Sequence, residues 1–134
     1  MSKYIAMKFI LTILMLALAN FAFAAPSDKL IDALVHVESK GENHVVGDNG
    51  RAVGVLQIHK EVVDDVNKRY GTSYTYADRK SIDKSREICR KYLLMYGGRN
   101  ATDEKYARIW NGGPRGHRKI ATRAYWRKVK RNLG

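Results

Sequence analysis

The segment KGENHVVGDNGRAVGVLQI, residues 40–58, decides the fold class that the sequence predicts. It is rich in Gly, Asn and Asp, and short runs of β-branched residues flank Asp48-Asn49-Gly50. Asn-Gly between two such runs is the strongest short-range signal for a β-hairpin. We therefore expect a small, irregular hairpin in this segment.

Helical patterns surround the hairpin on both sides. Ser27 and Asp28 can cap a helix in which Ile31 and Leu34 fall on one face. Helices are predicted over residues 29–39, 60–70, 83–96, 102–110 and 118–132, with a connector over residues 71–81. The fold class is therefore α+β, mainly α: a single domain over residues 25–134 with several helices and one small hairpin.

Composition excludes several classes of site. The chain has 134 residues, a formal net charge of +12 and one cysteine, so an intramolecular disulfide or a cysteine-rich zinc site is excluded. The four histidines are scattered without the H-E-x-x-H spacing of a metal site. A metal site is therefore not expected. The sequence also contains no G-x-G-x-x-G or Walker motif, so no nucleotide cofactor is expected.

Residues 1–24 have the pattern of a secretory signal peptide. Lys3 and Lys8 precede an apolar run that ends in Ala22-Phe23-Ala24. The run is short for a membrane span, although a retained membrane anchor is an alternative, as is a buried helix. We expect an exported protein of the periplasm, envelope or extracellular space, and cleavage lowers its net charge from +12 to +10.

Glu38 occupies the continuation of an apolar helical stripe. Ile31 and Leu34 precede it on the same face, where burial disfavours an ionised carboxyl. The negative end of the helix dipole also disfavours it, so the pKa of Glu38 is expected to be raised. A carboxyl that keeps its proton near neutral pH suits general-acid cleavage of a glycosidic bond. Alternatively, Glu38 turns outward and forms a surface ion pair with Lys40 or Arg51.

Short polar groups that suit a sugar-binding cleft follow Glu38. Asp48 and Gln57 lie in the Gly-rich hairpin, and Trp110 and Asn111 precede two glycines that let backbone approach a ligand closely. Three of these residues have an alternative explanation: Asp48 as a turn former, Trp110 as a core residue and Asn111 as a helix cap.

Three motifs occur in one order along the chain: Glu38-Ser39, Gly54-Val55-Leu56-Gln57 and Trp110-Asn111-Gly112-Gly113. In this order the chain resembles the soluble lytic transglycosylase and goose-type lysozyme branch of the lysozyme superfamily, over about residues 30–128. It departs from that branch in having Trp110 where Tyr is usual and Leu56 where Met is usual.

The resemblance implies a lysozyme-like fold that cleaves the β-1,4 bond between N-acetylmuramic acid and N-acetylglucosamine in peptidoglycan. It implies that Glu38 is the catalytic acid/base and that Ser39 supports its carboxylate. It also implies that Gln57 and Asn111 bind the glycan or position groups around Glu38. Two further residues of the segment YARIWNGGP are expected to bind substrate or support the site: Tyr106 and Trp110.

The resemblance leaves two reaction outcomes. Transglycosylases of this type use one Glu, which protonates the leaving oxygen and then accepts the proton of the sugar 6-hydroxyl, leaving a 1,6-anhydro end. Goose-type lysozymes add an Asp that helps hold the attacking water, and Asp48 is the candidate here. A second Asp of those enzymes corresponds to about His59, which is not an acid. We therefore expect a lytic transglycosylase, with a hydrolytic lysozyme or endolysin using Glu38 and Asp48 as the alternative.

The C-terminal segment is strongly basic, with no acid from Arg115 onward. It suits attachment to anionic cell-wall polymers, or it is a solvated helix face whose Ile120, Ala124 and Val129 pack on the core. A non-enzymatic basic envelope-binding protein is a further alternative. The expected partners are peptidoglycan strands and anionic wall polymers. We expect a monomer and, because the chain is exported, no nucleic acid.

Overall fold

Ser27 directly precedes the first helix among residues 25–134, which are the residues that the computed structural model describes. Its side-chain oxygen accepts a hydrogen bond from the Leu30 backbone N–H at 3.1 Å, which caps helix α2, Asp28–Ser39. Leu30 and Leu34 on this helix are fully buried. The helix is thus the one that the sequence predicts, while the predicted signal peptide lies outside the described residues.

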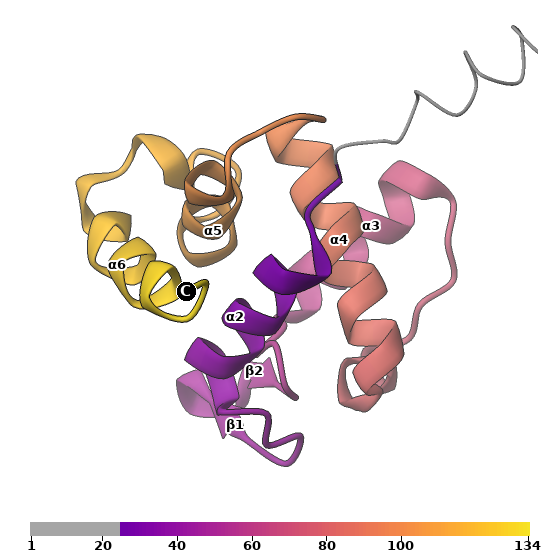
Figure 1. Cartoon of the computed structure of the whole chain (residues 1–134). Coiled ribbons are helices and arrows are strands. Elements are labelled where there is room, and N and C mark those ends of the chain that lie inside the picture. Colours follow the sequence, from indigo (N-terminus) through magenta and orange to yellow (C-terminus); the bar gives the residue numbers. More distant parts are fainter. Residues whose placement is uncertain (1–24) are drawn as a thin grey trace, which may run out of the picture.

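The predicted hairpin is confirmed. Strands β1, Val46–Gly47, and β2, Ala52–Val53, pair antiparallel, with Val46 opposite Val53. The 3₁₀ turn Asp48–Gly50 connects them. The hairpin follows the C-terminal end of α2 (Figure 1), so it lies beside the last turn that carries Glu38.

Three further helices agree with the predicted ranges to within two residues. Ser81 and Thr102 cap two of them with side-chain hydrogen bonds. Their bounds are α3, Lys60–Tyr70; α4, Ile82–Gly97; and α5, Asp103–Gly112. Helix α2 contacts α4, α5 and α6, Arg123–Arg131, and its apolar residues form one core with theirs. The structure thus confirms the predicted mainly helical α+β domain.

The last helix begins later than predicted, at Arg123 instead of residue 118. Residues 116–122 form two 3₁₀ turns that hydrogen bonds hold against α5. Arg108 donates from Nε to the Thr122 hydroxyl and from Nη2 to the Lys119 carbonyl. Ile120 is 76% exposed as a result, so the prediction that it packs on the core is wrong, as it is for the exposed Ala124.

The predicted connector over residues 71–81 contains a 3₁₀ helix, Tyr76–Lys80, that braces the hairpin. Arg79 is buried there and its Nη1 donates to the carbonyls of Arg51 and Ile58. Gly54 lies under the Arg79 carbonyl with a φ of +82°, and a Cβ on it would come within 2.1 Å of that oxygen. This glycine is therefore required by both its conformation and its neighbour.

Within the part of the chain that the structure describes, no helix is long and apolar enough to cross a membrane.

Candidate active site

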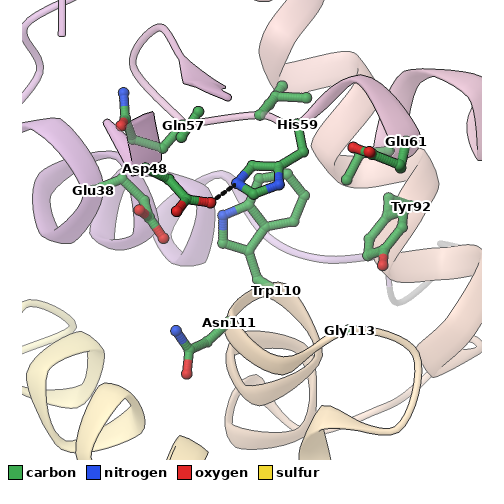
Figure 2. Close-up of a pocket in the computed structure, with 12 residues that line it drawn as sticks. Glu38, Asp48, Gln57, His59, Glu61, Tyr92, Trp110, Asn111 and Gly113 are labelled. Carbon is green, nitrogen blue, oxygen red and sulfur yellow. Dashed lines mark ion pairs between the residues drawn. The ribbon is translucent and has the colours of Figure 1, made fainter. Parts of the chain in front are cut away.

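A cleft of about 490 Å³ opens where α2, the hairpin and the C-terminal end of α5 meet. Figure 2 shows Glu38, Asp48 and Gln57 on one side of this space and Trp110 and Asn111 on another. The fold therefore brings five of the site residues that were predicted from sequence around one cavity. Its other lining residues are Ala52, Ile58, His59, Glu61, Val62, Tyr92 and Gly113.

Glu38 lies on the last turn of α2, and burial raises the pKa of its carboxyl. The Tyr125 hydroxyl donates a hydrogen bond of 2.7 Å to Glu38 Oε1, which lowers that pKa by a smaller amount. None of the ion pairs between described residues includes Glu38, and Arg51 pairs with Asp48 instead. The alternative of an outward-facing Glu38 paired with Lys40 or Arg51 is therefore wrong.

Ser39 supports the site through the backbone instead of through the Glu38 carboxyl. Its hydroxyl, which is buried, donates to the Val55 carbonyl at 2.8 Å and accepts from the Gly41 N–H at 3.1 Å. These bonds tie the end of α2 to the segment that follows β2. Ser39 thus fixes where Glu38 stands relative to Gln57.

Asp48 points into the cleft from the hairpin turn, where its φ is +50°. Arg51 Nη2 lies 3.0 Å from one carboxylate oxygen of Asp48, and His59 Nε2 lies 3.1 Å from the other. His59 is the residue before α3, and the dashed line in Figure 2 marks its contact with Asp48. Asp48 is therefore more than a turn former, because two basic side chains fix its carboxylate beside the cavity.

Gln57 closes the base of the hairpin, with a φ of +52°. Its amide nitrogen donates to the carbonyls of Val45 and Gly54, each at 2.9 Å. Its amide oxygen lies so close to Gly47 that a Cβ there would come within 2.6 Å of it. The side chain lines the cleft, but its amide nitrogen donates both of its hydrogen bonds within the hairpin. The position of Gln57 therefore favours a role in positioning groups around Glu38 over direct hydrogen-bond donation to a glycan.

Trp110 and Asn111 come from the last turn of α5. The half-buried Trp110 meets Tyr92 edge to face, with ring centroids 5.8 Å apart. Asn111 is exposed to the cleft and its side chain makes no hydrogen bond within residues 25–134. The helix is capped by the backbone of Gly113 and not by Asn111, so the amide of Asn111 is available to a ligand.

Tyr106 does not line the cleft. It is 2% exposed, its ring lies against Gly97, and its hydroxyl donates to the Gly98 carbonyl at 2.5 Å. The expectation that Tyr106 binds substrate is therefore wrong, because this side chain fills the contact between α4 and α5. What it can support is the position of α5, which carries Trp110.

Sequence patterns alone do not predict the roles of Tyr125, His59 and Tyr92 in the site. No periodicity in the sequence reveals that Tyr125 meets a glutamate 87 residues away along the chain. Among residues 25–134, no group of three or more His, Cys, Asp or Glu side chains could hold a metal ion. The cleft does hold carboxyl groups with fixed partners, namely Glu38 with Tyr125 and Asp48 with Arg51 and His59.

The sequence is similar to lysozymes of bivalve molluscs, although no family model matches the chain. A lysozyme of Ostrea edulis is 30% identical over 128 residues, which cover 88% of this chain and 92% of that protein. A lysozyme of Magallana gigas is 39% identical over 79 residues, or 57% of this chain and 56% of that protein. Lysozyme 1 of Crassostrea virginica is 33% identical over 85 residues, 61% of this chain and 45% of that protein. The chain thus spans about half the length of the last two relatives.

The fold is similar to that of a chain in the crystal structure of Aeromonas hydrophila PliI in complex with Meretrix lusoria lysozyme. The TM-score is 0.67 at 25% identity, and the match covers 78% of this chain and 88% of the other. The similarity supports a lysozyme-like fold. Membership of the soluble lytic transglycosylase and goose-type branch of that superfamily stays a prediction.

Proposed function

Because this chain belongs to the lysozyme family, we propose that it cleaves the β-1,4 bond between N-acetylmuramic acid and N-acetylglucosamine in peptidoglycan by hydrolysis. The observation that carries the proposal is the partly buried Glu38 carboxyl at the wall of a cleft that also holds Asp48. The names of the relatives support a lysozyme over the transglycosylase that we expected from sequence.

In the proposed mechanism, Glu38 is the general acid. Burial keeps its carboxyl protonated to higher pH than a free glutamic acid, so it can protonate the oxygen of the leaving sugar. After bond cleavage Glu38 is an ionised carboxylate, and the Tyr125 hydroxyl stabilises this charge with its hydrogen bond. Tyr125 thus favours the form of Glu38 that the reaction produces.

Asp48 is the second carboxylate that hydrolysis requires. It lines the same cleft as Glu38, and Arg51 and His59 hold its two oxygens. In the proposed reaction Asp48 orients the water that attacks the anomeric carbon and, as the base, accepts the proton that this water loses. Trp110 offers an aromatic face to a sugar ring, and Asn111 offers an amide to its polar substituents.

Transglycosylation is the second candidate, because burial raises the pKa of Glu38 in the cleft and this reaction needs one such carboxyl. Digestion of purified peptidoglycan in ¹⁸O-labelled water separates the two reactions. Hydrolysis gives reducing ends that carry one labelled oxygen, whereas cyclisation gives unlabelled 1,6-anhydro ends. Unlabelled anhydro ends as the main product would overturn the proposal of hydrolysis.

The basic C-terminal surface is proposed to bind anionic wall polymers outside the cytoplasm, where peptidoglycan lies. Arg123, Arg127, Lys130 and Arg131 are exposed and share one face of α6. Val129, on the opposite face, is fully buried. None of the ion pairs between described residues involves the exposed cations of this surface, so their charge is open to a polyanion. They are Arg115, Arg118, Arg123, Arg127, Lys128, Lys130 and Arg131.

A further inference from the structure

His59 lies between the hairpin and α3, directly before the first residue of that helix. Its imidazole is 38% exposed on the wall of the cleft, and its Nε2 lies 3.1 Å from Asp48 Oδ2. Although His59 occupies the N-cap position of α3, its side chain makes no capping hydrogen bond. The side chain is therefore directed to Asp48 instead of to the helix.

The two basic partners of Asp48 differ in where they are anchored. Arg51 belongs to the same turn as Asp48, is 67% exposed and moves with the hairpin. His59 instead follows Ile58, which is buried in the core and accepts a hydrogen bond from the buried Arg79. A contact to His59 therefore fixes Asp48 relative to the core, which Arg51 alone does not.

Orientation matters because the turn itself strains the backbone at Asp48. Asp48 and Asn49 both have positive φ, at 50° and 55°, a conformation that is unfavourable for residues other than glycine. A turn of this kind needs contacts that hold it. The contact from His59 to Asp48 joins it directly to the start of α3.

We propose that His59 is a positioning residue that holds the Asp48 carboxylate toward the attacking water. This inference rests on the proposed hydrolysis with Asp48 as second carboxylate. A misplaced carboxylate lowers the rate of the chemical step more than it weakens sugar binding. Loss of the His59 contact is thus expected to lower kcat about tenfold and to leave KM within about twofold.

The test compares His59→Gln with His59→Asn on soluble glycan chains. The amide nitrogen of Gln reaches as far as imidazole Nε2, so His59→Gln is expected to keep kcat within about threefold. The amide of Asn falls short, so His59→Asn is expected to show the tenfold loss. Asn is also a favourable N-cap, so this variant retains a folded α3. His44→Asn is the matched control, because this 83% exposed histidine pairs with Glu42 and does not line the cleft, and it is expected to behave like the wild type.

A double-mutant cycle with Asp48→Asn shows whether His59 acts through Asp48. In that background His59→Asn is expected to cause no further loss of the residual kcat. An undiminished loss there, or a wild-type kcat for the single variant His59→Asn, would overturn the positioning role. Failure of the proposed function is a separate outcome: Asp48→Asn would then itself retain full hydrolysis.

Discussion

Two features of its surroundings shift the pKa of Glu38 in opposite directions. Burial disfavours its ionised form and raises the pKa, while the hydrogen bond from Tyr125 stabilises the ionised form and lowers it. The alkaline limb of the kcat/KM profile reports the acid of the free enzyme. The two effects can therefore be separated in the pH dependence of catalysis.

Tyr125→Phe removes the hydrogen bond but keeps the ring. The pKa of Glu38 is expected to rise further, so the alkaline limb of kcat/KM moves to higher pH. The profile is measured on soluble glycan chains, with Tyr70→Phe as the control, because the Tyr70 hydroxyl bonds the Lys91 carbonyl and not a residue of the cleft. An alkaline limb that stays in place or moves to lower pH would contradict this account of Tyr125.

Glu38→Gln is expected to stabilise the fold at neutral pH. The folded-state pKa of Glu38 is raised, so the folded protein holds more protons than the unfolded chain and loses stability as pH rises above the ordinary range of Glu. Gln has no charge to bury, so the free energy of unfolding of the variant should exceed that of the wild type at pH 7. Below the unfolded pKa of Glu the difference should vanish. Urea titrations at pH 7 and pH 3.5 measure both, and equal stabilities at pH 7 would refute the raised pKa.

The hairpin and its brace are the element on which Asp48 and Gln57 depend. The buried Arg79 bonds the backbone on either side of β2, and Gly54 allows the two segments to touch. Any change that separates them should move both side chains together. Stability and activity are therefore coupled at this element.

Gly54→Ala is expected to destabilise the protein by about 3 kcal/mol or more, because a Cβ meets the Arg79 carbonyl and the positive φ is strained. Gly71→Ala is the matched control, since Gly71 also has a positive φ, +63°, but its Cβ would meet nothing within 4 Å. It should cost only about 1 kcal/mol. Denaturant unfolding of the two variants measures the difference, and equal losses would contradict the bracing by Arg79.

Local signals predicted most elements, and tertiary contacts explain the exceptions. Asn49-Gly50 and the caps Ser27 and Thr102 are local, so the hairpin and the helices follow from sequence. The start of α6 does not, because Arg108 on another helix holds residues 116–122 in 3₁₀ turns.

At the scale of the whole molecule, charge is distributed unevenly around the cleft. The last 30 residues contain no acid, and the face of α6 opposite to Val129 carries four exposed cations. On its inner side the same helix holds Tyr125 against Glu38. Binding of a polyanion to α6 would therefore bring the wall close to the Glu38 carboxyl.

Arg127→Gln combined with Lys130→Gln is expected to weaken adsorption to whole anionic cell walls about tenfold at low salt. Cleavage of short soluble glycans should be unchanged, because neither residue lines the cleft. The control variant changes two exposed lysines elsewhere, Lys29 and Lys68, to Gln. Equal losses in the two double variants would show a net-charge effect and contradict a localised surface.

Only the site residues that stand out in a local sequence pattern could be predicted from the sequence. Glu38 interrupts an apolar helical stripe, and Asp48, Gln57 and Asn111 lie close to glycines of predicted turns. Tyr125 and His59 act through contacts across the fold, which no local pattern encodes. Tyr106 lies in the same segment as the third motif, but the packing of α4 against α5 buries it.

Peptidoglycan lysis by Glu38→Gln, compared with Glu42→Gln, tests the central claim most directly. Both variants lose one carboxyl close to the end of α2, but Glu42 is 59% exposed and lies outside the cleft. Glu38→Gln should fold, bind cell walls and release at least 1,000-fold fewer new glycan ends per minute, while Glu42→Gln should match the wild type. Release of glycan ends by Glu38→Gln at the wild-type rate would contradict the assignment of Glu38 as the catalytic acid.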